Sequence, residues 1–174
     1  MNKLLVVIDV QNDFVDGSLG SAQAQSAVAH MAEKIRSFQG DICVTQDTHT
    51  DEYLGTQEGR FLPVVHCVAG TAGHNLNSDV LDALKNVGYR TFRKDRFASI
   101  ELVEYIRGGG YDEVHLIGIC TDICVISNAL LIKAFLSELP LFVDATCCAG
   151  TTPQMHEKAL DVMAVCQTVI EHRA

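Results

Sequence analysis

The stretch GICTDICV, residues 118–125, joins a short apolar strand to a helix, and this junction decides the fold. The pattern predicts the strand over 113–117 and the helix over 125–135. Open α/β sheets present their chemistry at the carboxyl ends of their strands, which is where Cys124 stands. A thiol in the first turn of a helix faces the positive end of the helix dipole, which predicts a lowered pKa. Cys124 is therefore either a nucleophile or a buried core cysteine.

Strands and helices alternate along the rest of the chain, which predicts a parallel sheet with helices on both faces. The apolar run at 3–8 is typical of a strand that is buried on both sides. A long segment without clear periodicity, 47–77, interrupts the alternation. We expect one domain over residues 1–174. Its other predicted strands cover 41–45, 90–93, 139–143 and 168–170, and its other predicted helices cover 22–38, 78–87 with Ser78 as cap, 99–107 with Ser99 as cap, and 153–165.

Composition excludes several classes of partner. A formal net charge of −9 disfavours nucleic acid and anionic membranes, and the absence of Trp disfavours a base-stacking surface. No apolar run approaches the length of a membrane span. The seven cysteines lack the regular spacing of a secreted disulfide scaffold. We therefore expect a reduced, cytoplasmic protein that binds neither nucleic acid nor membrane.

Three chemically useful side chains follow predicted strands: Asp9, Lys94 and Cys124. Taken singly, Asp9 could be a turn residue and Lys94 a solvated surface lysine. Together they offer a general base, a cation and a nucleophile, which is the set that covalent catalysis requires. No His follows a strand end after Cys124, so Asp and Lys would have to activate the thiol.

A second group lies in the long segment. Asp47 and His49 are two residues apart directly after a strand end, and Glu58 and His66 follow. Two imidazoles with two carboxylates are ligands suited to Zn, Mn or Fe(II). A structural zinc site would instead be rich in thiolates. The alternative is ordinary loop hydrogen bonding, with the loop held by packing of Phe61, Leu62, Val64 and Val65 on the sheet.

Several blocks of sequence resemble the isochorismatase-like cysteine hydrolases, and nicotinamidases in particular. They occur in the family's order between about residues 4 and 165. The blocks are VIDVQNDF at 7–14, DTH at 47–49, LPVVHCVAGT at 62–71, Lys94 with Phe97 behind it, GICTDICV at 118–125, Asp144-Ala145, and HEKAL at 156–160.

The resemblance implies a three-layer α/β/α fold whose six-stranded parallel sheet has the order 3-2-1-4-5-6. It implies a catalytic triad of Asp9, Lys94 and Cys124. It also implies a cis peptide bond before Cys120, which is costly for a non-proline residue and would be kept for function. In the family this bond turns two backbone N–H groups, here those of Cys120 and Cys124, toward one point as an oxyanion hole.

The same resemblance assigns the remaining site residues. The metal ligands are expected to be Asp47, His49, Glu58 and His66, holding one divalent transition metal, Zn, Mn or Fe. Phe14, Leu62 and Phe97 are expected to line the substrate pocket, with ordinary core packing as the alternative for Phe14.

The implied activity is hydrolysis of a small carboxamide through a thioester, with nicotinamide giving nicotinate and ammonia. The implied partners are a small-molecule amide and further copies of the chain in a homo-oligomer. Many nicotinamidases carry an aromatic residue near the position of Leu62 and Pro63, and this chain has no Trp. That departure leaves open an N-carbamoyl amidase of the same family, or a non-catalytic ligand-binding relative.

Overall fold

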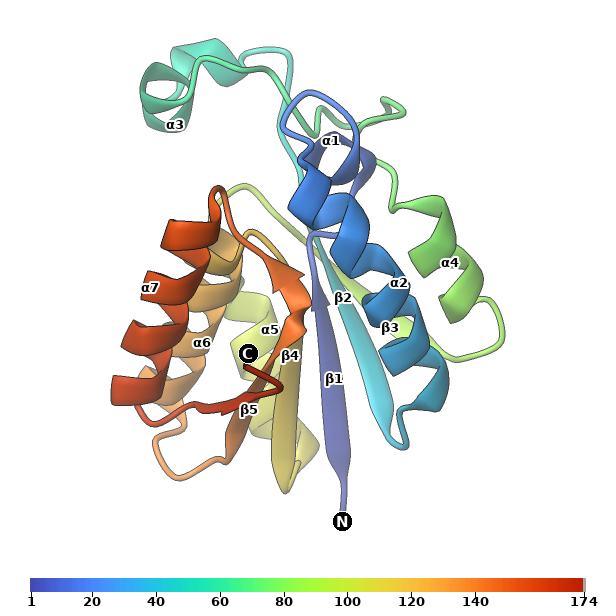
Figure 1. The fold of residues 1–174 in the computed structure, drawn as a ribbon, viewed down its shortest axis with the longest axis vertical. Helices are drawn as coiled ribbons and strands as arrows, with labels where there is room; N and C mark the ends of the chain where they lie inside the picture. The colour runs from blue at the N-terminus through green and yellow to red at the C-terminus, as the bar shows by residue number, and fades with distance from the viewer. Residues whose placement is uncertain (174) are drawn as a thin grey trace.

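The computed structural model describes residues 1–173, in which strands and helices alternate (Figure 1). The strands are β1 (Lys3–Ile8), β2 (Asp41–Asp47), β3 (Tyr89–Lys94), β4 (Glu113–Ile119), β5 (Leu141–Ala149) and β6 (Val169–Glu171). The α-helices are α1 (Asn12–Val15), α2 (Ala22–Ser37), α3 (Gln57–Phe61), α4 (Ser78–Leu84), α5 (Ile100–Gly109), α6 (Ile126–Phe135) and α7 (Pro153–Val165). A 3-10 turn, η1 (Tyr53–Gly55), and a π turn, η2 (Thr121–Val125), complete them.

The strands form one parallel sheet with the order β3-β2-β1-β4-β5-β6, which confirms the predicted topology. Successive strands are added outward from β1 in one direction as far as β3 and then, from β4 onward, in the opposite direction, so the strand order reverses between β1 and β4. At such a reversal the loops after neighbouring strands separate and leave a crevice at the carboxyl edge. The site must therefore be sought around the residues that follow β1 and β4.

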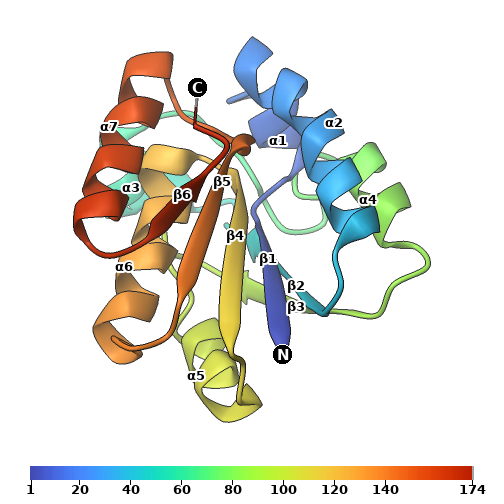
Figure 2. The same cartoon turned by 60° about the horizontal axis from the view of Figure 1, so that its bottom comes forward.

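Two hydrophobic cores sandwich the sheet. On one face Leu5 and Val7 of β1 pack with apolar residues of α2 and α4, and on the other face Leu4 and Val6 pack with those of α5, α6 and α7. Figure 2 shows α2 and α4 on one side of the sheet and the other three helices opposite. Because alternate residues of β1 enter opposite cores, its continuous apolar run is explained. Among residues 1–173 no helix is long and apolar enough to cross a membrane.

The structure corrects several predicted boundaries. Asn77, rather than Ser78, caps α4, because its Oδ1 accepts the Asp79 N–H at 3.0 Å. Within the long segment, η1 and α3 form where no helix was predicted. Phe61 and Val65 are 85% and 46% exposed, so these two side chains do not pack on the sheet as the alternative to a metal site supposed. β5 extends to Ala149, well beyond its predicted end, with an irregularity in its pairing to β4.

Gly118 lets β4 approach β1 closely just before the Cys124 turn. Its φ is +135°, a backbone conformation that residues other than glycine rarely adopt. A Cβ added there would collide with the carbonyl oxygen of Ile8. The position of the turn relative to the end of β1 therefore depends on this glycine.

Gly118→Ala is expected to lower the free energy of unfolding by about 1–3 kcal/mol, through backbone strain and the collision with Ile8. Gly108→Ala is the matched control, because Gly108 lies in α5 and a Cβ there meets no atom within 4 Å. This second change should instead stabilise by about 0.5–1 kcal/mol. Urea unfolding measures both, and equal effects would contradict the close approach.

Candidate active site

The ends of four adjacent strands bring four reactive side chains together. Asp9 follows β1, Asp47 and Lys94 end β2 and β3, and Cys124 lies in η2 after β4. All four are buried. The sheet order places β3, β2, β1 and β4 side by side, so residues far apart in sequence meet at one edge.

Lys94 is the centre of this group. Its Nζ lies 2.6 Å from Asp9 Oδ2, 3.4 Å from Asp47 Oδ1 and 3.6 Å from Cys124 Sγ. Burial disfavours its charge, but the neighbouring carboxylates prevail and raise the pKa of Lys94 above its ordinary value. Lys94 is therefore a fixed cation beside the thiol, rather than a proton donor at neutral pH.

Asp9 is held for proton transfer. It has a left-handed backbone, with φ of +51°, and Thr45 Oγ1 donates a hydrogen bond to its Oδ1 at 2.7 Å. Its Oδ2 is paired with Lys94 but accepts no well-aligned hydrogen bond among residues 1–173. Burial raises the pKa of Asp9, and the charge of Lys94 opposes that shift. An aspartate with a raised pKa, whose second oxygen is held, among the described residues, only by the ion pair to Lys94, is suited to accept a proton.

Cys124 has the expected position but not the expected acidity. Burial and the nearby Asp9 carboxylate raise the pKa of its thiol well above the ordinary value, while Lys94 opposes them. The predicted lowering by the helix dipole was wrong, because a dipole effect of about 0.3–1 kcal/mol is smaller than the cost of burying a thiolate. A thiol whose pKa is raised needs a base to become a nucleophile.

The turn before Cys124 offers a backbone donor. The peptide bond between Ile119 and Cys120 is cis, as the resemblance implied. The Cys120 N–H donates to no acceptor among residues 1–173. This N–H is thus free to bind an oxyanion, the role expected for Cys120 together with Cys124.

A buried asparagine that the sequence reading did not identify fixes this turn. Asn128 Nδ2 donates to the carbonyl oxygens of Cys124 at 2.8 Å and Phe97 at 3.2 Å, and its Oδ1 accepts the Ser99 N–H at 3.1 Å. It connects the nucleophile turn to the segment after Lys94. The available signal was an asparagine four residues after Cys124, in a mainly apolar helix.

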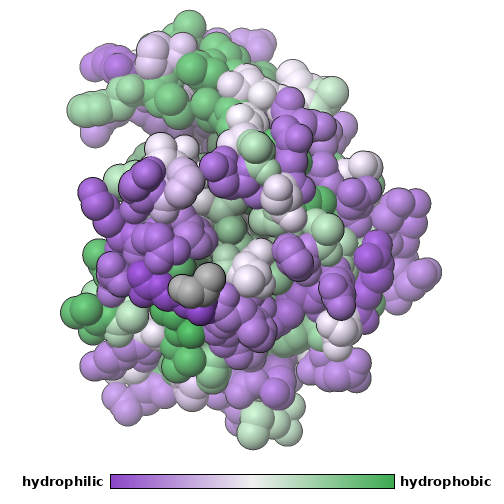
Figure 3. Space-filling view, viewed as in Figure 1, coloured by the Kyte–Doolittle hydropathy of each residue, from purple (hydrophilic) through white to green (hydrophobic). Residues whose placement is uncertain are grey.

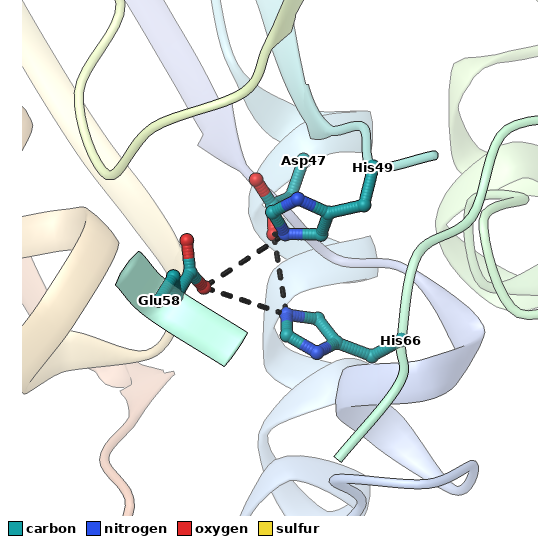
Figure 4. A group of neighbouring side chains, drawn as sticks. All are labelled: Asp47, His49, Glu58 and His66. Carbon is teal, nitrogen blue, oxygen red and sulfur yellow. Dashed lines mark hydrogen bonds and ion pairs between the residues drawn. The ribbon is translucent and has the colours of Figure 1, made fainter. Parts of the chain in front are cut away.

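The four predicted metal ligands converge (Figure 4). One ligand atom from each of Asp47, His49, Glu58 and His66 lies within 4.8 Å of all the others. Asp47 Oδ2 lies 2.9 Å from His49 Nε2 and 3.5 Å from His66 Nε2. Glu58 Oε1 lies 3.8 Å from His49 Nε2 and 3.7 Å from His66 Nε2. Burial opposes the charge of Asp47, but the two neighbouring imidazoles and the charge of Lys94 prevail and hold the pKa of Asp47 below its usual range.

The surroundings fit a divalent cation. His66 Nδ1 donates to the Val64 carbonyl at 2.8 Å, which leaves Nε2 with its lone pair toward the group. Gln11 clamps the backbone of Asp47, accepting its N–H at 2.7 Å and donating to its carbonyl at 2.9 Å. Two carboxylates beside two imidazoles give the charge and ligand types that Zn, Mn or Fe(II) prefers.

Cys124 and all four predicted metal ligands line one cavity of about 1070 Å³. Phe14, Leu62 and Phe97 line it, as expected, and the Phe14 ring lies 5.4 Å from that of His66. The lining also includes Cys120, together with residues that the sequence did not indicate, namely Leu19, Tyr53, Phe61 and Ile123. A ligand in this cavity can therefore reach the thiol and the four ligand side chains at once.

Sequence and structure comparisons with known proteins point to the same family. A sequence model described as the isochorismatase domain matches residues 3–174. A nicotinamidase/pyrazinamidase of Mycobacterium tuberculosis is 30% identical over 144 residues, which are 73% of this chain and 76% of that protein. The structure of the Bacillus subtilis nicotinamidase/pyrazinamidase superposes with a TM-score of 0.86 at 24% identity, covering 99% of this chain and 100% of the other. The pyrazinamidase of Pyrococcus horikoshii in complex with zinc gives 0.79 at 25% identity, covering 98% of each chain.

Asn128→Asp is expected to lower the free energy of unfolding by about 1–3 kcal/mol, because carboxylate oxygens would face the Cys124 and Phe97 carbonyls in a buried site. Asn12→Asp is the control, since Asn12 Nδ2 donates only to the Ala72 carbonyl near the surface. Urea unfolding should show a much smaller loss for this control. Equal losses in the two variants would contradict the clamping role of Asn128.

Proposed function

The chain belongs to the isochorismatase family, and we propose that within it the protein is a cysteine-dependent amidohydrolase that converts nicotinamide to nicotinate and ammonia. One observation carries this proposal: Cys124, whose thiol lies 3.6 Å from the Asp9-paired Lys94, lines the same cavity as the four ligand side chains. The curated relative and the solved structures compared above bear the names nicotinamidase and pyrazinamidase, which supports the same substrate class.

Acylation would begin with proton transfer from the Cys124 thiol to Asp9 Oδ2. The sulfur then attacks the carboxamide carbon, and Lys94 Nζ, 3.6 Å away, stabilises the charge on the sulfur during this step. The N–H groups of Cys120 and Cys124 would bind the developing oxyanion. When the C–N bond breaks, Asp9 returns the proton to the leaving nitrogen, and ammonia departs from a thioester.

Deacylation would use the same residues in reverse. Asp9 accepts a proton from water, the water oxygen attacks the thioester, and the proton returns to the Cys124 sulfur as nicotinate leaves. Asp47, His49, Glu58 and His66 would hold a divalent ion, which supplies Lewis acidity toward water and toward a pyridine nitrogen. Phe14 and Leu62 would pack against the ring and orient its carboxamide toward the thiol.

An N-carbamoyl amidase remains the second candidate within the family, because the chain lacks Trp to stack on a pyridine ring. That activity would use the same triad on an open-chain substrate and would not require the metal-ligand group. A non-catalytic relative would be expected to lack a triad member, whereas Asp9, Lys94 and Cys124 are all present and adjacent.

Cys124→Ala should abolish ammonia release from nicotinamide, because no thioester can form. Asp9→Asn should lower turnover by roughly 10²–10⁴-fold, since the amide cannot accept the thiol proton. The loss in Asp9→Asn combined with Lys94→Ala should be much smaller than the product of the single losses, because the residues act as a unit.

Cys43→Ala is the control for these variants, since Cys43 is buried in β2 outside the cavity lining. A coupled assay for ammonia measures each enzyme. Full activity in Asp9→Asn would remove Asp9 from the mechanism, and full activity in Cys124→Ala would exclude the proposed chemistry altogether.

Protein purified without a histidine tag is expected to contain about one equivalent of Zn, Mn or Fe by elemental analysis. His49→Ala should lose this metal because one of four ligands is removed. His74→Ala is a matched control, since His74 is buried but its Nε2 bonds the Thr48 hydroxyl, outside the ligand group. Metal-free protein with full turnover in a chelator would contradict the site and favour the N-carbamoyl amidase.

A further inference from the structure

The cavity is larger than nicotinamide requires. Its volume of about 1070 Å³ reaches the upper end of the about 300–1,000 Å³ typical of pockets that hold drug-sized ligands. Nicotinamide is a single six-membered ring with one carboxamide group. A ring placed against Cys124 and the metal-ligand group would therefore leave much of the cavity unfilled.

Part of the cavity lining is apolar, and two of its rings lie at the surface. Leu19 from the loop before α2, Phe61 from the end of α3, Phe97 from the loop after β3 and Ile123 from η2 all line the cavity. Phe61 is 85% exposed and Phe97 is 46% exposed. Figure 3 shows apolar residues gathered where α3 overhangs the body, with an indentation of the surface beneath them. Two large rings exposed at the mouth of an active-site cavity would gain contacts from an apolar ligand.

The overhanging segment is held in place. The Thr56 side chain caps α3 by accepting the Gly59 N–H at 3.0 Å, and the buried Tyr53 donates its hydroxyl to the Leu62 carbonyl at 2.9 Å. These bonds secure the segment on both sides of Phe61. The outer wall is therefore preformed, which limits the entropy lost when a ligand binds.

Charge at the cavity rim does not favour an ionic ligand. Arg96 and Asp95 both line the mouth, and Arg96 Nε lies 2.8 Å from Asp95 Oδ1, so each compensates the other. The chain carries a net charge of −9, which disfavours an anionic substituent in particular. An uncharged apolar group is the occupant that this surface suits best.

We propose that Leu19, Phe61, Phe97 and Ile123 form an outer subsite for an uncharged alkyl or aryl substituent on the substrate ring. The preferred substrate is then a nicotinamide that carries such a group on the ring side away from the carboxamide and the ring nitrogen. This inference rests on the proposed function, since the inner part of the cavity must hold the carboxamide.

The test compares nicotinamide with its 5-methyl, 5-propyl and 5-phenyl derivatives. The value of kcat/KM should rise by up to about fourfold per added methylene, mainly through a lower KM, as the substituent leaves water. In Phe61→Ser the ratio of kcat/KM for 5-phenylnicotinamide over nicotinamide should fall at least about fivefold. Phe135→Ser is the matched control, because Phe135 is also an exposed phenylalanine, 51% accessible, but does not line this cavity, and its ratio should equal that of the wild type.

Binding to the Cys124→Ala variant separates failure of the subsite from failure of the proposed activity. Calorimetry should show tighter binding of 5-phenylnicotinamide than of nicotinamide, even if the active enzyme hydrolyses neither compound. Equal affinities, with nicotinamide still hydrolysed by the wild type, would overturn the subsite alone. Phe61→Ser could instead leave the ratio of kcat/KM for 5-phenylnicotinamide over nicotinamide unchanged and alter the sedimentation coefficient. Phe61 would then be assigned to contact with a second copy of the chain, and the subsite would again be overturned.

Discussion

The buried ammonium group of Lys94 is the constraint on which the site depends. Removing one partner from a buried ion pair typically costs about 3–5 kcal/mol, because the remaining charge is left uncompensated. Here one cation lies against Asp9 and Asp47 from neighbouring strands and against the Cys124 sulfur. In the part of the chain that the structure describes, Asp9 has Lys94 as its one cationic partner, whereas Asp47 is also supported by the His49 and His66 imidazoles. Lys94 is charged because both carboxylates compensate it. The ends of β1, β2 and β3 must therefore stay in register, and the glycine that brings β4 close to β1 places the thiol in the same cluster.

Asp47 connects the two halves of the site through its two oxygens. Oδ1 faces Lys94 at 3.4 Å, and Oδ2 faces His49 at 2.9 Å. Any positive charge among the ligand side chains therefore competes with Lys94 for the same carboxylate. A stronger pull on Asp47 would leave more of the Lys94 charge for Asp9 and the thiol, and would make the thiolate easier to form. The electrostatics of the nucleophile and of the metal-ligand group are thus coupled by one side chain.

The sequence predicted those parts of the protein that depend on local pattern and on strand order. The apolar runs at β1 and β4 place Asp9 and Cys124 at one sheet edge. Lys94 was suggested by its place after a strand and the ligand set by its residue types, and the family resemblance supported both. Other features depend on tertiary contacts that no local pattern encodes. Asn128 is recognised as a clamp only when the Phe97 and Ser99 backbones are seen beside it. The exposure of Phe61 and the raised pKa of Cys124 both depend on what surrounds the residue, and the dipole of the helix start is the weaker influence.

Different parts of the chain build the two ends of the cavity. The inner end consists of strand-end residues whose positions are fixed by sheet hydrogen bonding and by mutual charge compensation. The outer end consists of Leu19, Phe61 and Phe97, which lie on loops or at the end of a short helix. The ion pairs of Lys94 with Asp9 and Asp47 involve none of the outer residues, so substitutions at the outer end are expected to leave the buried charges in place. Amide chemistry can therefore persist in this fold while the group attached to the amide changes, which is how one fold serves several substrates.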